Sequence, residues 1–236
     1  MARAKLARPT GNHLLDRLPA AELDKLLADA DLIRFPAKAE VYGVGAVGQP
    51  VYFPASGVYS LLLPLKDGAH VEVAVADSEG MLGIPQVLGM EAHPLRAVAQ
   101  VEGECIRIPT ERFLVVLRGC GVLDVLVRRF LAVSWQTANQ NIACNIRHTV
   151  RERTCRWLLT VHDRAKADEF EVTQEVLAAM VGASRQKVSA VAVTLQESGY
   201  IAYQRGRVRV LNRAGLASAS CECYQVLKKA HEFLTS

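Results

Sequence analysis

The spacing of apolar residues changes along the chain and divides it into stretches of different character. Residues 12–30 place leucines at helical spacing, with Pro19 opening the second half of the run. From about residue 31 to 109, short apolar alternations are separated by Gly, Pro, Asp and Ser, which is typical of an antiparallel roll or jelly roll. Strands are expected at 32–35, 40–42, 51–53, 57–64, 70–76, 95–101 and 105–108.

The helical period returns after residue 110, and its longest run extends from about 121 to 147 with two apolar stripes. The first stripe consists of Leu123, Leu126, Phe130, Val133 and Thr137. The second consists of Leu131, Trp135, Ala138, Ile142 and Ile146. Two stripes are wider than one core needs, so we expect one to pack on the β-region and the other to meet a twin helix. A helix buried within one domain is the alternative. Shorter helices are expected at 110–117, 152–165 and 214–233.

Residues 170–210 predict two helices joined by a glycine turn and followed by a β-hairpin. Thr173 and Ser184 are good N-caps, and Gly182 suits the left-handed end of the first helix. This order is the helix-turn-helix signature. The apolar positions expected to point inward are Val176, Leu177, Met180 and Val181, then Val188, Val191, Leu195 and Val193. Runs at 200–203 and 207–210 form the hairpin, or wing.

The polar side of the second helix carries groups that can read DNA. Arginine donates a bidentate pair to guanine and glutamine does the same to adenine, so we expect Arg185 to read guanine. The expected contacts to base edges or phosphates come from Gln186 and Ser189, and those to phosphate from Lys187, Arg205, Arg207, Thr173 and Gln174. Ser184 completes the expected DNA-binding set. Between residues 184 and 213 there are six Lys/Arg and one acid. The alternative is a solvated helical hairpin with ordinary surface charge.

This stretch resembles the winged helix-turn-helix of the Crp/Fnr family of transcription regulators. The matching residues are Thr173, Gly182, Ser184, Arg185, Val188, Ser189, Leu195, Gly199, Ile201, Gly206 and Arg207. Gln186 and Ala190 depart from the Glu and Arg that members often carry, so the operator sequence cannot be transferred. The resemblance implies an α+β fold with a cyclic-nucleotide-binding-like β-roll at 1–120, a dimerisation helix at 121–148 and a winged helix-turn-helix at 149–236. It also implies a homodimer on a palindromic operator, with RNA polymerase as a further partner.

The β-region resembles the cyclic-nucleotide-binding roll of the same family through Gly57, Gly80, Gly83 and Arg96-Ala97. In nucleotide-binding members, the glutamate of a Gly-Glu pair holds the ribose hydroxyl, and an arginine holds the phosphate. Met81 stands at the glutamate position, and Ala138 beside Asn139 stands where a threonine meets the purine. The effector is therefore not expected to be cyclic AMP. The alternative role for Arg96 is a structural ion pair with an acid such as Glu79. An alternative effector is heme, with His70 or His93 as its ligand.

Charge and composition agree with a nucleic-acid partner. The net charge is +4, and residues 149–236 carry 13 Lys/Arg against 9 Asp/Glu, so this part holds the whole excess. No apolar run is long enough to span a membrane and the start lacks a secretory signal, so we expect a cytoplasmic protein. A small-ligand or redox sensor acting through protein contacts is the second hypothesis. An enzyme is disfavoured because no nucleophile triad, metal spacing or phosphate loop is present.

Two local patterns resemble functional motifs. The run Gly43-Val44-Gly45-Ala46-Val47-Gly48 fits a dinucleotide fingerprint, but β residues follow it, so we interpret it as a turn. Six cysteines show no disulfide framework and no C-x-x-C pair, and no metal site is expected. The Cys221-Glu222-Cys223 pair is compatible with a sensor or metal site, although packing or a surface position is the expected role.

Overall fold

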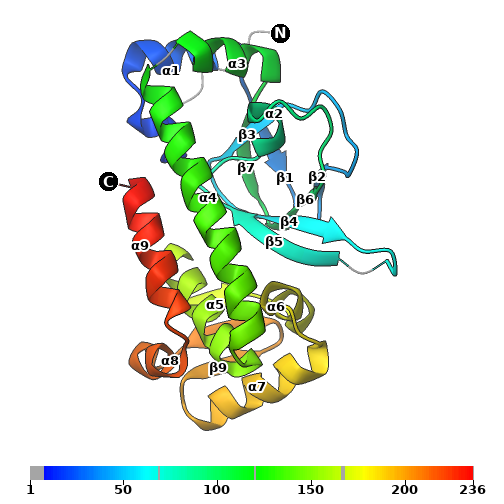
Figure 1. Cartoon of the computed structure of the whole chain (residues 1–236). Helices are drawn as coiled ribbons and strands as arrows, with labels where there is room; N and C mark the ends of the chain where they lie inside the picture. The colour runs from blue at the N-terminus through cyan, green and yellow to red at the C-terminus, as the bar shows by residue number, and fades with distance from the viewer. Residues whose placement is uncertain (1–7, 69, 120, 166–167, 236) are drawn as a thin grey trace. The chain divides into compact units, whose positions relative to one another are not determined.

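The computed structural model describes residues 8–68, 70–119, 121–165 and 168–235 of the 236-residue chain. It separates into two compact units, one formed by Met1–Ser134 with Leu234–Ser236 and the other by Trp135–Phe233. The division falls inside the long helix α4 (Gly121–Arg147), which therefore contributes residues to both units (Figure 1).

Short antiparallel strands of the N-terminal unit form two sheets that enclose an apolar core. The first sheet has the order β1-β7-β3, made of β1 (Asp31–Phe35), β7 (Gly103–Ile108) and β3 (Val51–Pro54). The second has the order β2-β6-β4-β5, made of β2 (Glu40–Tyr42), β6 (Arg96–Val101), β4 (Val58–Pro64) and β5 (His70–Ala76). All seven strands expected from the sequence are present, with ends that differ by at most two residues. The core between them contains Tyr42, Tyr52, Tyr59, Leu61, Leu82 and Ala97.

Helices flank this roll. They are the 3-10 turn η1 (Leu15–Arg17), α1 (Ala20–Leu27), α2 (Ile84–Val87), α3 (Thr110–Gly119) and the first half of α4. The leading helical run is broken where Leu18 becomes extended and Pro19 takes the N-cap position of α1. The glycine-rich run forms a turn, in which Gly45 and Gly48 have positive φ and β3 follows instead of a helix. The dinucleotide fingerprint therefore lacks the helix N-terminus that it needs.

The C-terminal unit places helices around a three-stranded sheet of order β8-β10-β9. Its elements after α4 are α5 (Val150–Ala165), β8 (Glu169–Glu171), α6 (Gln174–Val181), α7 (Arg185–Glu197), β9 (Ile201–Gln204), β10 (Arg207–Val210), α8 (Arg213–Ala219) and α9 (Cys223–Thr235). β8 was not predicted. The final helix predicted at 214–233 is also wrong as one piece, because Ser220 is extended and separates α8 from α9.

A left-handed glycine joins α6 to α7. The Thr173 hydroxyl accepts a hydrogen bond from the Val176 amide at 3.2 Å and caps α6. Gly182 ends α6 with φ 61° and ψ 48°. The Ser184 hydroxyl then accepts from the Lys187 amide at 3.4 Å and caps α7. Both predicted caps and the glycine turn are therefore confirmed, and they determine where each helix ends.

An ionic network joins α5 to α8 and α9. Arg213 and Tyr224 donate hydrogen bonds to the two oxygens of Asp163 at 2.8 and 2.6 Å, and Arg213 also donates to the Tyr224 hydroxyl at 2.7 Å. Burial alone would raise the pKa of Asp163, but the bonds from Arg213 and Tyr224 outweigh it and hold the pKa below its ordinary value. The ionised carboxylate thus stabilises the C-terminal unit.

Among the described residues, no single helix is both long and apolar enough to cross a membrane. α6 and α7 pass that test of length and composition only as a pair, and the pair is bent by 104° at the glycine turn.

We predict that Gly182→Ala lowers the free energy of unfolding by about 1–2 kcal/mol, because a Cβ disfavours the left-handed backbone at this position. Gly182→Asn should cost less, because asparagine tolerates this conformation. Urea unfolding of the two variants measures the difference. Equal losses for Ala and Asn would show that the backbone conformation is not the cause.

We predict that Asp163→Asn lowers the free energy of unfolding at pH 7 by about 1–2 kcal/mol, since it removes the charged acceptor of Arg213 and Tyr224. The native pKa of Asp163 is depressed, so its contribution is present above the unfolded pKa of about 3.9 and is lost as pH falls through the native pKa. The difference between wild type and variant should therefore shrink below about pH 4. Glu197→Gln, at an exposed carboxylate, is the control. A difference that does not change with pH contradicts this role.

Candidate functional site

The first turn of α7 presents three exposed polar side chains, Arg185, Gln186 and Lys187. They are exposed because the opposite face of the helix is buried, at Val188, Ala192 and Leu195. The sequence prediction placed Val193 inward, and that is wrong: Val193 is 50% exposed and the smaller Ala192 is buried instead. Ala192 lies three residues before Leu195 and four after Val188, which is the spacing of one helical face.

The residues predicted to contact DNA have few competing partners on α7. Arg185 has its Nη1 at 3.8 Å from the Glu175 carboxylate, and both side chains are more than 60% exposed. Such a pair contributes about 0–1 kcal/mol and exchanges readily with another anion. Gln186 and Lys187 form no ion pair or hydrogen bond through their side chains with any other described residue.

Ser189 and Gln174 bond to each other across the helix pair. The Ser189 hydroxyl donates to Gln174 Oε1 at 2.5 Å. This bond ties α7 to the first turn of α6 and leaves the Gln174 amide nitrogen as a donor. A contact from the Ser189 hydroxyl to DNA would have to compete with it. Thr173 and Ser184 are likewise engaged through their hydroxyls as caps, and Thr173 stands at the helix N-terminus that the sequence predicts near phosphate.

The wing ends in a two-residue turn made of Arg205 and Gly206. Their φ angles are 51° and 76°, so both lie in the left-handed region, as a type I′ hairpin turn requires. Asn, Asp and Gly are the usual residues there, and an arginine costs about 1 kcal/mol. Arg205 is exposed and pairs with no acid among the described residues. The turn therefore holds a free guanidinium at the tip of the wing.

Acidic residues from another strand neutralise the arginines of the wing strand β10. β8 pairs with β10 and places Glu171 beside Arg207 and Glu169 beside Arg209. The guanidinium groups contact these carboxylates at 2.9 and 2.6 Å. The predicted role of Arg207 as a phosphate ligand therefore requires it to exchange Glu171 for phosphate. The count of charges in the sequence covered residues 184–213 and did not include β8. The neutralisation of Arg207 and Arg209 by Glu171 and Glu169 was therefore not predicted.

The predicted effector residues of the β-roll do not reproduce a cyclic-nucleotide site. Met81 is 1% exposed, and its thioether cannot take the place of a carboxylate that binds ribose hydroxyls. The Arg96 guanidinium donates to Glu40 at 2.5 Å, so its charge is already paired. The pairing acid is Glu40 rather than the Glu79 considered from the sequence. Ala97 is buried within β6.

Gly80 has a packing role, because a Cβ there would lie 2.9 Å from the Phe130 ring. Ala138 and Asn139, the other two predicted pocket residues, are exposed and belong to the C-terminal unit.

The two histidines considered as heme ligands differ in environment. His70 is exposed at the start of β5, as a surface residue would be. His93 is buried, its ring stacks on Tyr42 with centroids 3.7 Å apart, and its Nε2 lies 2.5 Å from the Gln86 amide nitrogen. Burial lowers the pKa of His93. Its ring thus packs within the roll, stacked on Tyr42.

Comparison with known families and proteins agrees with this architecture. A cyclic nucleotide-binding domain model matches residues 32–119, and a Crp-like helix-turn-helix domain model matches residues 152–219. The cyclic AMP receptor protein of Thermus thermophilus is 24% identical over 204 residues, which cover 86% of this chain and 94% of that protein.

Solved structures show the same fold. FixK2 of Bradyrhizobium japonicum aligns with a TM-score of 0.73 at 18% identity, over 81% of this chain and 98% of that one. TTHA1359, a Crp/Fnr-family transcriptional regulator of Thermus thermophilus, aligns with a TM-score of 0.67 at 20% identity, over 80% and 98%. The chain therefore belongs to the Crp/Fnr family and is a DNA-binding transcription regulator.

Proposed function

We propose that the protein binds a palindromic operator as a homodimer, with α7 of each copy in a major groove and each wing turn against the flanking backbone. The observation that carries this proposal is the exposed first turn of α7, with Arg185, Gln186 and Lys187 next to one another. Arg185 reads guanine, Gln186 reads a neighbouring base edge, and Lys187 contacts phosphate. Twofold symmetry puts the two half-sites about one helical turn of DNA apart.

Contacts to the DNA backbone position the helix in this proposal. Arg205 reaches phosphate from the wing tip, and Arg207 joins it by giving up an exposed ion pair that contributes little to stability. Thr173, Gln174 and Ser184 stand at helix N-termini, whose free amides and positive dipole end favour phosphate. These contacts carry affinity and register, whereas specificity comes from Arg185 and Gln186.

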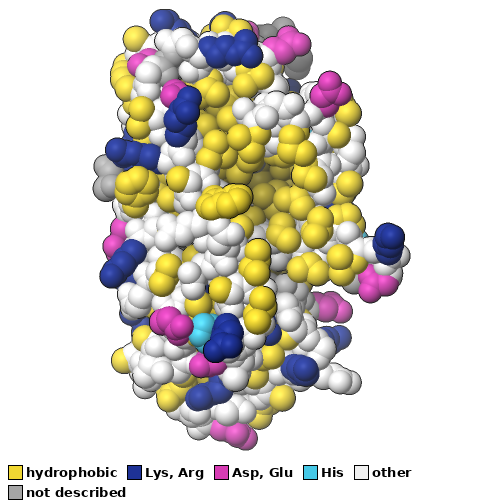
Figure 2. All heavy atoms as spheres, viewed as in Figure 1, with side chains coloured by type: hydrophobic (Ala, Val, Ile, Leu, Met, Phe, Trp, Pro, Cys, Tyr) yellow, Lys and Arg dark blue, Asp and Glu magenta, His cyan; other side chains and the backbone are white. Residues whose placement is uncertain are grey.

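The dimer is supported by an unpartnered apolar stripe on α4. Trp135, Ile142 and Ile146 are 73%, 60% and 76% exposed, while Leu123, Leu126 and Val133 of the other stripe are buried. Figure 2 shows exposed hydrophobic side chains on one face of the molecule. The steps between 131, 135, 138, 142 and 146 are all three or four residues, as in the seam of a coiled coil. A second copy of α4 is the partner that this periodicity fits.

The proposed effector is not cyclic AMP. Met81 and the Glu40–Arg96 pair replace the groups that would hold the ribose and phosphate, and a buried site that lacks a polar partner discriminates strongly against its ligand. On family membership alone, we extend the proposal to RNA polymerase as a partner and to action in the cytoplasm, where the DNA lies. We assign the chain no enzymatic activity, because the family consists of transcription regulators.

We predict that Arg185→Ala weakens binding to the operator by about 1–3 kcal/mol and relaxes the preference at one base pair of each half-site. Arg185→Lys is the matched control: it keeps the charge but loses the bidentate fork, so discrimination should fall while binding to random DNA is retained. Electrophoretic shifts on operator and single-base variants measure both effects. An equal loss on every sequence would assign Arg185 to phosphate instead.

We predict that Arg205→Asn weakens binding to all DNA sequences alike and reduces the slope of log K against log salt by about 0.9, the value for one phosphate contact. The same variant should be as stable as wild type or more stable, because asparagine relieves the left-handed strain at the turn. Arg205→Lys retains a charge and should keep most of the slope. A slope that is unchanged in Arg205→Asn contradicts the wing contact.

A further inference from the structure

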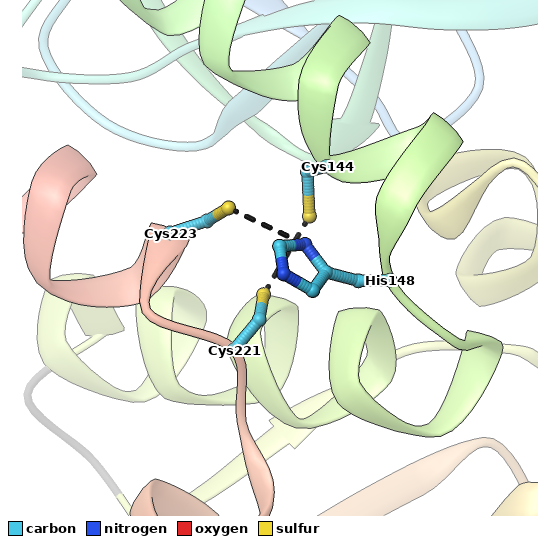
Figure 3. Close-up of side chains that lie close together, drawn as sticks. All are labelled: Cys144, His148, Cys221 and Cys223. Atoms are coloured by element: carbon cyan, nitrogen blue, oxygen red, sulfur yellow. Dashed lines mark hydrogen bonds between the residues drawn. The ribbon is translucent and has the colours of Figure 1, made fainter.

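Four side chains that are distant in sequence converge in the C-terminal unit and form what we call the Cys3His cluster: Cys144, His148, Cys221 and Cys223. Cys144 comes from the last turns of α4, His148 from the link to α5, and the other two from the start of α9 and the segment before it. The three cysteines are at most 4% exposed. Figure 3 shows the four side chains pointing toward a common centre.

The spacing of the cluster fits one tetrahedral ion. Its ligand atoms all lie within 4.8 Å of one another. The Cys144 and Cys221 sulfurs are 3.6 Å apart, and the Cys223 sulfur is 3.6 Å from His148 Nδ1. Zinc–sulfur bonds of about 2.3 Å and zinc–nitrogen bonds of about 2.0–2.1 Å set tetrahedral edges of about 3.8 and 3.6 Å. These two separations match edges of a zinc site, and separations of up to 4.8 Å within the cluster would shorten by no more than about 1 Å on binding.

We propose that the Cys3His cluster binds one zinc ion through three thiolates and His148 Nδ1. Three cysteines and one histidine are an established ligand set for structural zinc. Binding releases the three thiol protons to solvent and leaves a complex of net charge −1. Four protein ligands leave no open position, so the ion has a structural role.

The contacts around the cluster suit a metal-bound state. His148 Nε2 lies 3.2 Å from the Glu222 carboxylate, which leaves Nδ1 as the nitrogen that faces the sulfurs. A carboxylate on the outer nitrogen of a ligating histidine fixes its orientation and its tautomer. The Gln140 amide donates to the Cys223 sulfur at 3.0 Å, as an amide donor does to a thiolate.

Arg156 supplies the balancing charge. It is 6% exposed, and its Nε has no hydrogen-bond partner among the described residues. Burial raises the pKa of the Cys144 thiol, and the charge of Arg156 acts against that rise. A buried guanidinium is costly without an anion nearby. The net negative zinc–thiolate complex provides that anion.

Zinc would tie α9 to the end of α4 within the C-terminal unit. Cys221 and Cys223 lie on both sides of Glu222, at the point where Ser220 breaks the chain between α8 and α9. The sequence predicts packing for this pair and no metal site, because 77 residues separate Cys144 from Cys221 and no spacing motif connects them. The inference is independent of DNA binding.

The test is the metal content of the full-length protein, purified without added metal and measured by plasma mass spectrometry. We expect about one zinc per chain. Removing it with a chelator and adding Co2+ should give the intense visible bands of tetrahedral cobalt and a thiolate-to-cobalt charge-transfer band, which Zn2+ then abolishes. The cobalt spectrum uses the wild-type protein, so it remains decisive if a cysteine variant does not fold.

Matched variants separate ligands from other buried thiols. Cys221→Ser should lose the zinc, whereas Cys155→Ala, which changes an equally buried cysteine of the same unit, should keep it. Glu222→Gln should retain zinc with an affinity about 10–100-fold lower in chelator competition. Wild-type protein that takes up neither Zn2+ nor Co2+, or Cys221→Ser that keeps a full equivalent of zinc, overturns the proposal. So does a Cys144–Cys221 disulfide in the metal-free protein under non-reducing conditions that persists when Zn2+ and reductant are supplied.

Discussion

Burial of one face of α7 is the constraint on which the DNA-binding surface depends. Val188 and Leu195 join the core of the C-terminal unit, and Ala192 on the same face is buried, which leaves the first turn of the helix outward. The caps and the left-handed Gly182 determine where that turn begins. Hydrophobic burial thus orients groups that contribute nothing to the core, and the proposed reading of DNA depends on packing on the opposite side.

Electrostatics divides the basic residues into free and paired groups. Arg205 and Lys187 stand without an acidic partner among the described residues, while Arg207 and Arg209 are held by β8. In the β-roll, Arg96 is paired with Glu40 in the same way. The domain keeps the cyclic nucleotide-binding fold, but Arg96 would have to give up Glu40 before it could bind a phosphate. Together with the buried Met81, this ion pair is the basis for proposing an effector other than cyclic AMP.

Local patterns predicted most of the fold. Alternation marked every strand of the roll, and capping residues with a glycine marked the helix-turn-helix, because these features depend on neighbours in sequence. β8 was missed because Glu-Phe-Glu is too short to show a period, and the Arg207 pairing was missed with it. Val193 was misplaced because apolar character was weighed above helical spacing. The Cys3His cluster could not be foreseen, since only the tertiary fold brings its parts together.

The most direct test of the central claim is selection of bound sequences from a random DNA pool, carried out with and without cyclic AMP. If a dimer reads DNA through α7 without cyclic AMP, the selection recovers a palindrome equally under both conditions, with half-sites about one helical turn apart. An unpaired half-site, or no enriched motif, would contradict the dimer that reads DNA through α7. A palindrome recovered only with cyclic AMP would contradict the account of the β-roll, and would mean that the nucleotide binds despite Met81 and the Glu40–Arg96 pair.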